Sequence, residues 1–322
     1  MNKSSREKQA FINEFKGVLL EYTLAKEMAK GDSDLIFHEC DFLETISTYQ
    51  NYLMTIDLET FKSLPFVAKM MIKELEKKFG NQYTKVELAG KNHFSNWGEG
   101  DLLVDFKNRD PVLLSLKMIK DSSFINTKSG GAYSFFSKYF AAEDSQKKFA
   151  EDVSFSFEVF KKAFLKSFGR ENPELSFLEM LKSLGISDRP GTLKGVEQEM
   201  LFAFYESCLN SLVTELKKLK KRDPVQFVAG VKKVCGFSKD ITKVVFSYKN
   251  KENLRKDSKV FIESWDDYNI VSTDDLDFKE IKKSKSYVTL SSTKVDIQFR
   301  IKPMNSFATS GVKINVSVKA KN

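Results

Sequence analysis

The stretch "GEGDLLVDFKNRDPVLLSLKMIK", residues 98–120, places an acid and a lysine within two apolar runs. The first run begins at Asp101 and the second carries Lys117. Because the polar residues 107–111 separate the runs, the stretch is predicted to form a β-hairpin. A charged group within apolar strands is costly unless it is paired. Asp101 and Lys117 are therefore candidates for a catalytic pair.

The side of the sheet on which each side chain lies depends on the turn. If residues 108–110 form a three-residue loop, Asp101 faces Lys117 directly, and directly opposed residues share one face of a sheet. A two-residue loop or a bulge would reverse the parity and separate the pair. Ser115 shares a face with Lys117 in either case, because side chains alternate along a strand. The simplest alternative is a cross-strand ion pair at a sheet edge.

A third charged residue, Glu21, falls on the apolar side of a predicted helix. Residues 4–30 are expected to be helical, with a capping-like SSRE sequence at the start and Gly31 as a stop. At about 100° per residue, Glu21 lies between Ala25 and Met28. A carboxylate in such surroundings needs a partner or a metal ion. Glu21 is therefore either a buried acid satisfied by a lysine or a helix end, or a ligand near a catalytic centre.

The composition limits the class of protein. The chain has 322 residues, of which 41% are hydrophobic and 30% charged, enough for one large domain or two ordinary ones. No long apolar stretch or signal-peptide pattern occurs, and three distant cysteines fit a reducing compartment, so a cytoplasmic protein is expected. The net charge of +8 favours a polyanionic partner, with nucleic acid as the first candidate.

The order of predicted elements indicates a mixed α/β (α+β) fold, because a helical start, a cluster of strands, a long helical block and a second group of strands follow one another. Pro65 is expected to mark a break or a helix start. Helices are predicted over 4–30, 34–80, 132–168, 174–184, 193–220 and 224–234, and strands over 85–90, 101–106, 112–119, 242–248, 259–265, 286–292, 294–302 and 311–319.

An acid at a strand start, a following strand with a lysine, and a preceding helix with a glutamate resemble the PD-(D/E)XK nuclease superfamily. The tract SLKMIKDSSFINTKSGG, residues 115–131, looks like type II restriction endonucleases, and QFRIKPMN near the C-terminus does so more loosely. The resemblance implies a core of a helix, a three-stranded meander, a helix and a further strand. It also implies three regions: a nuclease core over 1–145 with a helical insertion at 34–80, a helical region over 146–235, and a β-rich region over 236–322 that completes the core sheet and contributes to DNA recognition.

The resemblance assigns roles to the charged residues. Asp101 matches the metal-binding aspartate, Lys117 the catalytic lysine, and Glu21 the acidic position of the first helix. The chain departs from the family pattern at Ser115, which stands where the motif has an acid. Another carboxylate must then replace it.

Glu21 is the first choice for that replacement, with Glu87 and Glu99 as alternatives. The backbone carbonyl of Leu116 is expected to be a further metal ligand. The cofactor implied is Mg²⁺, for which Mn²⁺ is expected to substitute.

The resemblance implies a type II restriction endonuclease that cuts double-stranded DNA as a homodimer, with a cognate DNA methyltransferase as its functional partner. Two alternatives remain open. One is a non-specific repair or recombination nuclease of the same fold, and the other is a non-catalytic DNA-binding protein on a degenerate nuclease core.

Polar and basic residues in three stretches are candidates for DNA contacts, because such side chains bind phosphates and base edges. The competing interpretations are an ordinary loop for the first stretch and a turn that starts an aromatic helix for the second. The candidates are Lys91, Asn92, His93, Asn126, Thr127, Lys128, Ser129, Arg300, Lys302 and Asn305.

Overall fold

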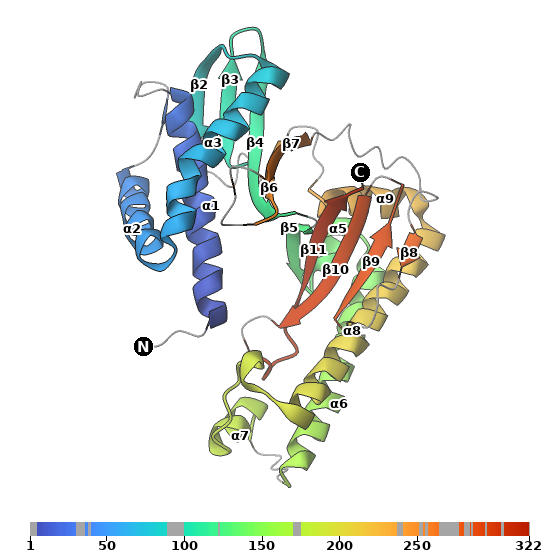
Figure 1. The fold of residues 1–322 in the computed structure, drawn as a ribbon. Helices are drawn as coiled ribbons and strands as arrows, with labels where there is room; N and C mark the ends of the chain where they lie inside the picture. Colours follow the sequence, from blue (N-terminus) through green and yellow to red (C-terminus); the bar gives the residue numbers. More distant parts are fainter. Residues whose placement is uncertain are drawn as a thin grey trace. The chain divides into compact units, whose positions relative to one another are not determined.

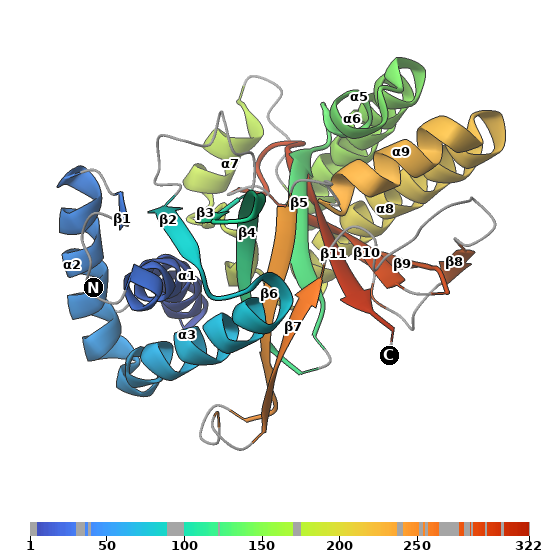
Figure 2. The same cartoon turned by 90° about the horizontal axis from the view of Figure 1, so that it is seen from above.

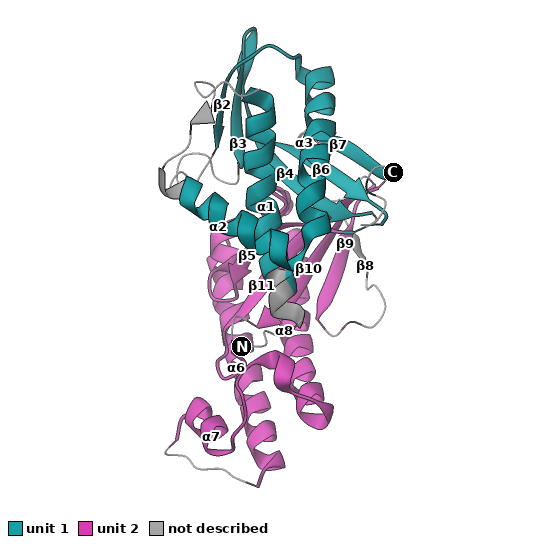
Figure 3. Cartoon of the chain, turned by 60° about the vertical axis from the view of Figure 1, so that its left-hand side comes forward, with its two compact units in different colours: residues 1–123, 238–267 teal, residues 124–237, 268–322 magenta. Residues whose placement is uncertain are grey.

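The chain divides into two compact units (Figure 3). Unit 1 comprises residues 1–123 and 238–267, and unit 2 comprises 124–237 and 268–322. The domain borders expected from the sequence, at residues 145 and 235, do not coincide with the borders of these two units and stay predictions. The computed structural model describes residues 5–29, 36–37, 40–88, 100–121, 123–169, 175–236, 241–250, 254, 257–263, 277–279, 284, 286–293, 295–303 and 306–321.

Unit 1 is built on a mixed six-stranded sheet with the order β1-β2-β3-β4-β6-β7 (Figure 1). Strands β2, β3 and β4 form an antiparallel meander, whereas β4 and β6 run parallel. The interior strands β3, β4 and β6 carry the apolar runs that the sequence showed. The strands are β1 (Ile36–Phe37), β2 (Tyr83–Leu88), β3 (Leu102–Phe106), β4 (Arg109–Lys120), β6 (Ile241–Tyr248) and β7 (Ser258–Glu263).

The helices in the described residues of this unit are α1 (Ser5–Ala29), α2 (Cys40–Ile56) and α3 (Leu58–Phe79). Helix α3 begins where it does because Asp57 caps it, accepting a hydrogen bond from the Thr60 N–H at 3.2 Å. Pro65 lies inside α3, so the expected break or helix start at this residue is wrong.

The apolar stripes of α1 and α3 pack on one face of the sheet (Figure 2). In α1, Leu20, Leu24 and Met28 recur every four residues and are buried, as expected for the inner side of an amphipathic helix. Alternate residues of β3 and β4, such as Val104 and Leu114, complete the same core. The intervening residues of these strands therefore lie on the other face.

The hairpin between β3 and β4 differs from the predicted register. A two-residue turn, 107–108, joins the strands, and a bulge follows, so that Val104 faces Val112. The predicted three-residue loop is therefore wrong. The residue opposite Asp101 on β4 is shifted by two positions from the predicted Lys117. The bulge adds to β4 the residue that the shorter turn lacks, so the residues that share a face of the two strands are the same as predicted. Asp101 and Lys117 consequently still belong to one face of the sheet.

Unit 2 contains an antiparallel five-stranded sheet with the order β5-β11-β10-β9-β8. Residues 129–131, expected as a turn before a helix, form the end of the edge strand β5, so that expectation is wrong. The strands are β5 (Ile125–Gly131), β8 (Asp277–Lys279), β9 (Tyr287–Ser291), β10 (Val295–Pro303) and β11 (Val312–Ala320).

Helices α5, α6, α8 and α9 lie together on one side of this sheet (Figure 2). Phe299 of β10 meets Phe135 of α5 with ring centroids 6.3 Å apart. Gly130 allows the same close packing, because a Cβ atom there would lie 3.0 Å from the Tyr139 ring. The helices are α5 (Phe135–Phe140), α6 (Glu143–Ser167), α7 (Phe177–Ser183), α8 (Gly195–Arg222) and α9 (Pro224–Val234), with a short 3₁₀ turn at Pro190–Thr192.

Of the helices in the described ranges, none combines the length and the apolar character needed to cross a membrane.

Candidate active site

Asp101 stands directly before β3 and is held by the backbone of β4. Its N–H donates to the Leu114 carbonyl oxygen at 2.7 Å, and its Oδ2 accepts from the Leu116 N–H at 2.6 Å. Gly100 precedes it, and any Cβ atom at that position would overlap the Leu113 side chain. The glycine therefore lets the chain approach β4 closely enough for both hydrogen bonds.

Lys117 lies on β4, with its Nζ 3.6 Å from Oδ2 of Asp101. The side chains are 33% and 18% exposed, so the pair is partly withdrawn from water. It is not at a sheet edge, because β4 lies between β3 and β6. The alternative of an ion pair at an edge is wrong in that respect, and the ion pair itself is present.

Ser115 is buried on the same face as Lys117 and hydrogen-bonds to the Asp101 carboxylate. Burial raises the pKa of Asp101, while Lys117, the Leu116 N–H and the Ser115 hydroxyl act in the opposite direction. Each of these three groups favours the ionised carboxylate. The hairpin therefore supplies an anion that is oriented by the backbone and by its neighbours.

Glu21 of α1 interacts electrostatically with this pair. Burial is the main cause that raises its pKa well above the ordinary value, the Asp101 charge raises it further, and Lys117 lowers it. Both electrostatic effects require that Glu21 lies near the two hairpin residues. The fold thus brings together three residues that the sequence placed in different elements.

These groups are suited to a hard divalent cation. Mg²⁺ prefers oxygen ligands and is commonly held by one or two carboxylates, with water and substrate phosphate completing its shell. Asp101 and Glu21 provide two carboxylates that repel each other. The carbonyl of Leu116 lies between Ser115 and Lys117 in the sequence. Within the described ranges, no group of three or more His, Cys, Asp or Glu side chains is arranged to hold a metal ion. Two carboxylates and a backbone carbonyl are oxygen donors of the kind that Mg²⁺ prefers.

The alternative carboxylates are placed differently. Glu87 of β2 is paired with Leu103, which puts it on the same face as Asp101, and it forms an ion pair with Lys85. Glu99 lies outside the described residues. Glu21 has an electrostatic interaction with both Asp101 and Lys117.

The DNA-binding candidates in unit 2 converge on its sheet. Asn126 and Ser129 lie on β5, and Arg300 and Lys302 on β10. The Thr127 hydroxyl is occupied within the fold, donating to the carbonyls of Val234 at 2.9 Å and Val316 at 3.1 Å. The remaining candidates Lys91, Asn92, His93 and Asn305 lie outside the described residues, and Lys128 is paired with Val316 in the β5–β11 ladder.

Sequence reasoning missed two polar residues that lie between these candidates. Lys313 and Asn315 of β11 face Lys302 and Arg300 respectively. The alternation in VKINVSVKA carried the signal, because lysine, asparagine and serine occupy every second position.

In comparisons with known proteins, no family model and no curated protein sequence matches this chain.

Proposed function

We propose that the protein is a Mg²⁺-dependent endonuclease that hydrolyses phosphodiester bonds in double-stranded DNA, as type II restriction enzymes do. The observation that carries the proposal is the meeting of Asp101, Lys117 and Glu21, with Asp101 fixed by two backbone hydrogen bonds. The order of α1, the meander β2-β3-β4 and the parallel strand β6 is in line with the core that the resemblance implies.

Each residue has a defined part in this proposal. Asp101 and Glu21 hold the cation together with the Leu116 carbonyl, and Ser115 keeps the Asp101 carboxylate oriented. A bound Mg²⁺ supplies Lewis-acid stabilisation of the phosphate and lowers the pKa of bound water. Lys117 orients the attacking water and offsets negative charge that develops on the phosphate. Glu21 would be ionised when it holds the cation, since a nearby positive charge favours the charged form of a carboxyl group.

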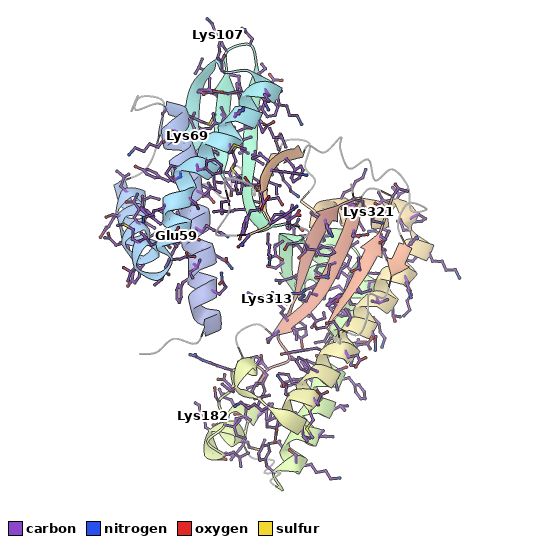
Figure 4. All side chains as sticks on the ribbon, in the orientation of Figure 1. Glu59, Lys69, Lys107, Lys182, Lys313 and Lys321 are labelled. Atoms are coloured by element: carbon purple, nitrogen blue, oxygen red, sulfur yellow. The ribbon has the colours of Figure 1, made fainter. Side chains whose placement is uncertain are left out.

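The test is cleavage of unmethylated phage DNA with Mg²⁺, followed by sequencing of the ends. Asp101→Ala and Lys117→Ala should abolish cleavage with circular dichroism unchanged. Lys107→Ala is the matched control, because Lys107 lies in the turn of the same hairpin (Figure 4) and should cut normally. Near wild-type turnover by either active-site variant would contradict the assignment.

The pattern of products distinguishes the nuclease classes. A discrete ladder with a common end sequence supports a site-specific enzyme, whereas a smear supports the repair or recombination alternative. The resemblance also implies that the enzyme is a homodimer and has a cognate methyltransferase, and both are part of this proposal. Analytical ultracentrifugation of the free protein and of its DNA complex tests the dimer.

A second candidate function is DNA binding without catalysis. Ser115 stands in place of the motif's acid, which favours this alternative. It predicts metal-independent binding and intact DNA after long incubation with either Mg²⁺ or Mn²⁺.

A further inference from the structure

The sheet of unit 2 has two chemically different faces. One face is apolar and packs against the helices through Val288, Phe299 and Ile314 among others. Because side chains alternate, the other face carries the polar residues of the same strands. The two longest of these strands, β10 and β11, pair without interruption from Val295–Ala320 to Pro303–Val312, so the two faces are kept apart along their whole length.

Positive charge is concentrated at one end of the polar face. Lys302 of β10 is directly opposite Lys313 of β11, and Arg300 lies two residues from Lys302 on the same face (Figure 4 labels Lys313). Like charges placed directly opposite each other across two strands destabilise a sheet. Burial lowers the pKa of Lys302, and the charge of Arg300 lowers it further. The fold therefore tolerates a local electrostatic cost here.

The neighbouring groups do not neutralise this charge. Within the described part of the chain, neither Lys302 nor Lys313 forms an ion pair with a carboxylate. Asp296, the acid on the same face of β10, pairs with Lys321 at 3.1 Å. Arg300 is instead held by neutral groups, donating to Gln298 Oε1 at 2.9 Å with its guanidinium 5.5 Å from the Tyr287 ring centroid. These contacts orient the guanidinium and leave its charge uncompensated.

Uncharged hydrogen-bonding groups continue the surface beside the cations. Asn315 pairs with Arg300 on one side and with Ser129 on the other. Ser317 follows on the same face, is buried, and donates to Asn126 Oδ1 at 2.7 Å, so it supports this surface from below. Cations flanked by amides and hydroxyls are the composition of a nucleic-acid contact surface, in which cations bind phosphates and amides reach base edges.

We propose that the polar face of β5, β11 and β10, centred on Lys302, Lys313, Arg300 and Asn315, is a docking surface for double-stranded DNA. Duplex rather than single-stranded DNA is the occupant, because single strands are bound mainly by stacking on aromatic side chains. The one aromatic residue among the described side chains of this face on β9, β10 and β11 is Tyr287, and Arg300 already lies against it. The surface acts by charge, so it binds without a divalent metal and independently of hydrolysis.

The experiment measures binding of a fluorescent 30-base-pair duplex by anisotropy in EDTA, at several salt concentrations. The test variant is the double substitution Lys302→Gln and Lys313→Gln, and the control is Lys162→Gln with Lys166→Gln. The control changes the net charge equally on exposed positions of α6. Because the two test lysines have no carboxylate partner, thermal stability of the test variant should equal or exceed that of the wild type.

The test variant should lose about tenfold or more in affinity at 0.1 M salt, and the slope of log affinity against log salt should fall by roughly 2. The control should bind like the wild type. Wild-type affinity in the test variant, equal losses in the control, or tighter binding of a single strand would each overturn the proposal. Absence of cleavage by the wild-type protein in Mg²⁺, with duplex binding intact, would refute the nuclease alone. If the test variant still cleaves DNA and binds the duplex as the wild type does, only the proposed docking surface is refuted.

Discussion

Replacement of Glu21 by glutamine should stabilise the protein in the absence of metal. Burial and the Asp101 charge raise the pKa of Glu21, so its ionised form is unfavourable in the folded state. Glutamine has the same size and carries no charge. An uncompensated buried polar group costs about 1–3 kcal/mol, and more when it is charged. For a unit of this size that corresponds to an increase in Tm of roughly 2–12 °C.

The pH dependence gives the sign of this effect. Below the ordinary carboxyl pKa, Glu21 is protonated in both the folded and the unfolded chain, so the substitution changes little. As the pH rises, the unfolded chain loses this proton first, and the folded chain retains it until its raised pKa is passed. The wild type therefore loses stability relative to Glu21→Gln, and the difference is largest above the folded pKa.

Differential scanning calorimetry in EDTA at a series of pH values from about 4 to about 8 measures this difference. Glu14→Gln is the control, because Glu14 lies on the same helix, is exposed, and accepts a hydrogen bond from the Tyr49 hydroxyl that an amide oxygen also accepts. Adding Mg²⁺ should raise the Tm of the wild type more than that of Glu21→Gln, since a ligand of the native state stabilises it by mass action. A Glu21→Gln protein that is less stable at pH 8, or whose advantage does not change with pH, would refute the reasoning.

Three further substitutions have defined outcomes. Lys117→Met should reduce the rate of single-turnover cleavage of an oligonucleotide duplex by about 100-fold or more. It should also shift the pH profile of this rate to higher pH, because Lys117 lowers the pKa of Asp101. An unshifted profile would contradict this coupling. Asp101→Asn should retain the hydrogen bond from Leu116 and the wild-type urea midpoint while losing cleavage, whereas Asp101→Ala should also lose about 1 kcal/mol of stability. Gly100→Ala should destabilise the protein by about 1–3 kcal/mol in urea unfolding, because the new methyl group displaces Leu113; unchanged stability would show that β4 accommodates it freely.

Local sequence signals were sufficient to predict helices whose ends are marked by a capping residue or a proline. The sequence predicted helix 224–234, and α9 has those bounds because Asp223 caps it and Pro224 occupies its first position. The position of Glu21 on the apolar side of α1 was also predicted from a local signal, because helical periodicity alone determines which side of a helix a residue occupies.

Long-range pairing explains most of the failures. Strand β5 has the sequence INTKSGG, which lacks apolar alternation and ends in two glycines, and it is extended because it pairs with β11 almost two hundred residues later. The hairpin register depended on a bulge whose position follows from packing of both strands, and the turn sequence does not encode it. Lys313 and Asn315 became candidates only when β11 was placed between β5 and β10.

The parallel ladder between β4 and β6 has a consequence for synthesis of the chain. The two strands are neighbours in space, yet the whole of residues 124–237 is translated between them. A nascent chain that has emerged only as far as Lys120 therefore exposes the unpaired backbone of β4, an edge prone to pairing with other chains. Pulse-labelled ribosome complexes should show this strand protected from exchange only after residue 248 has left the exit tunnel.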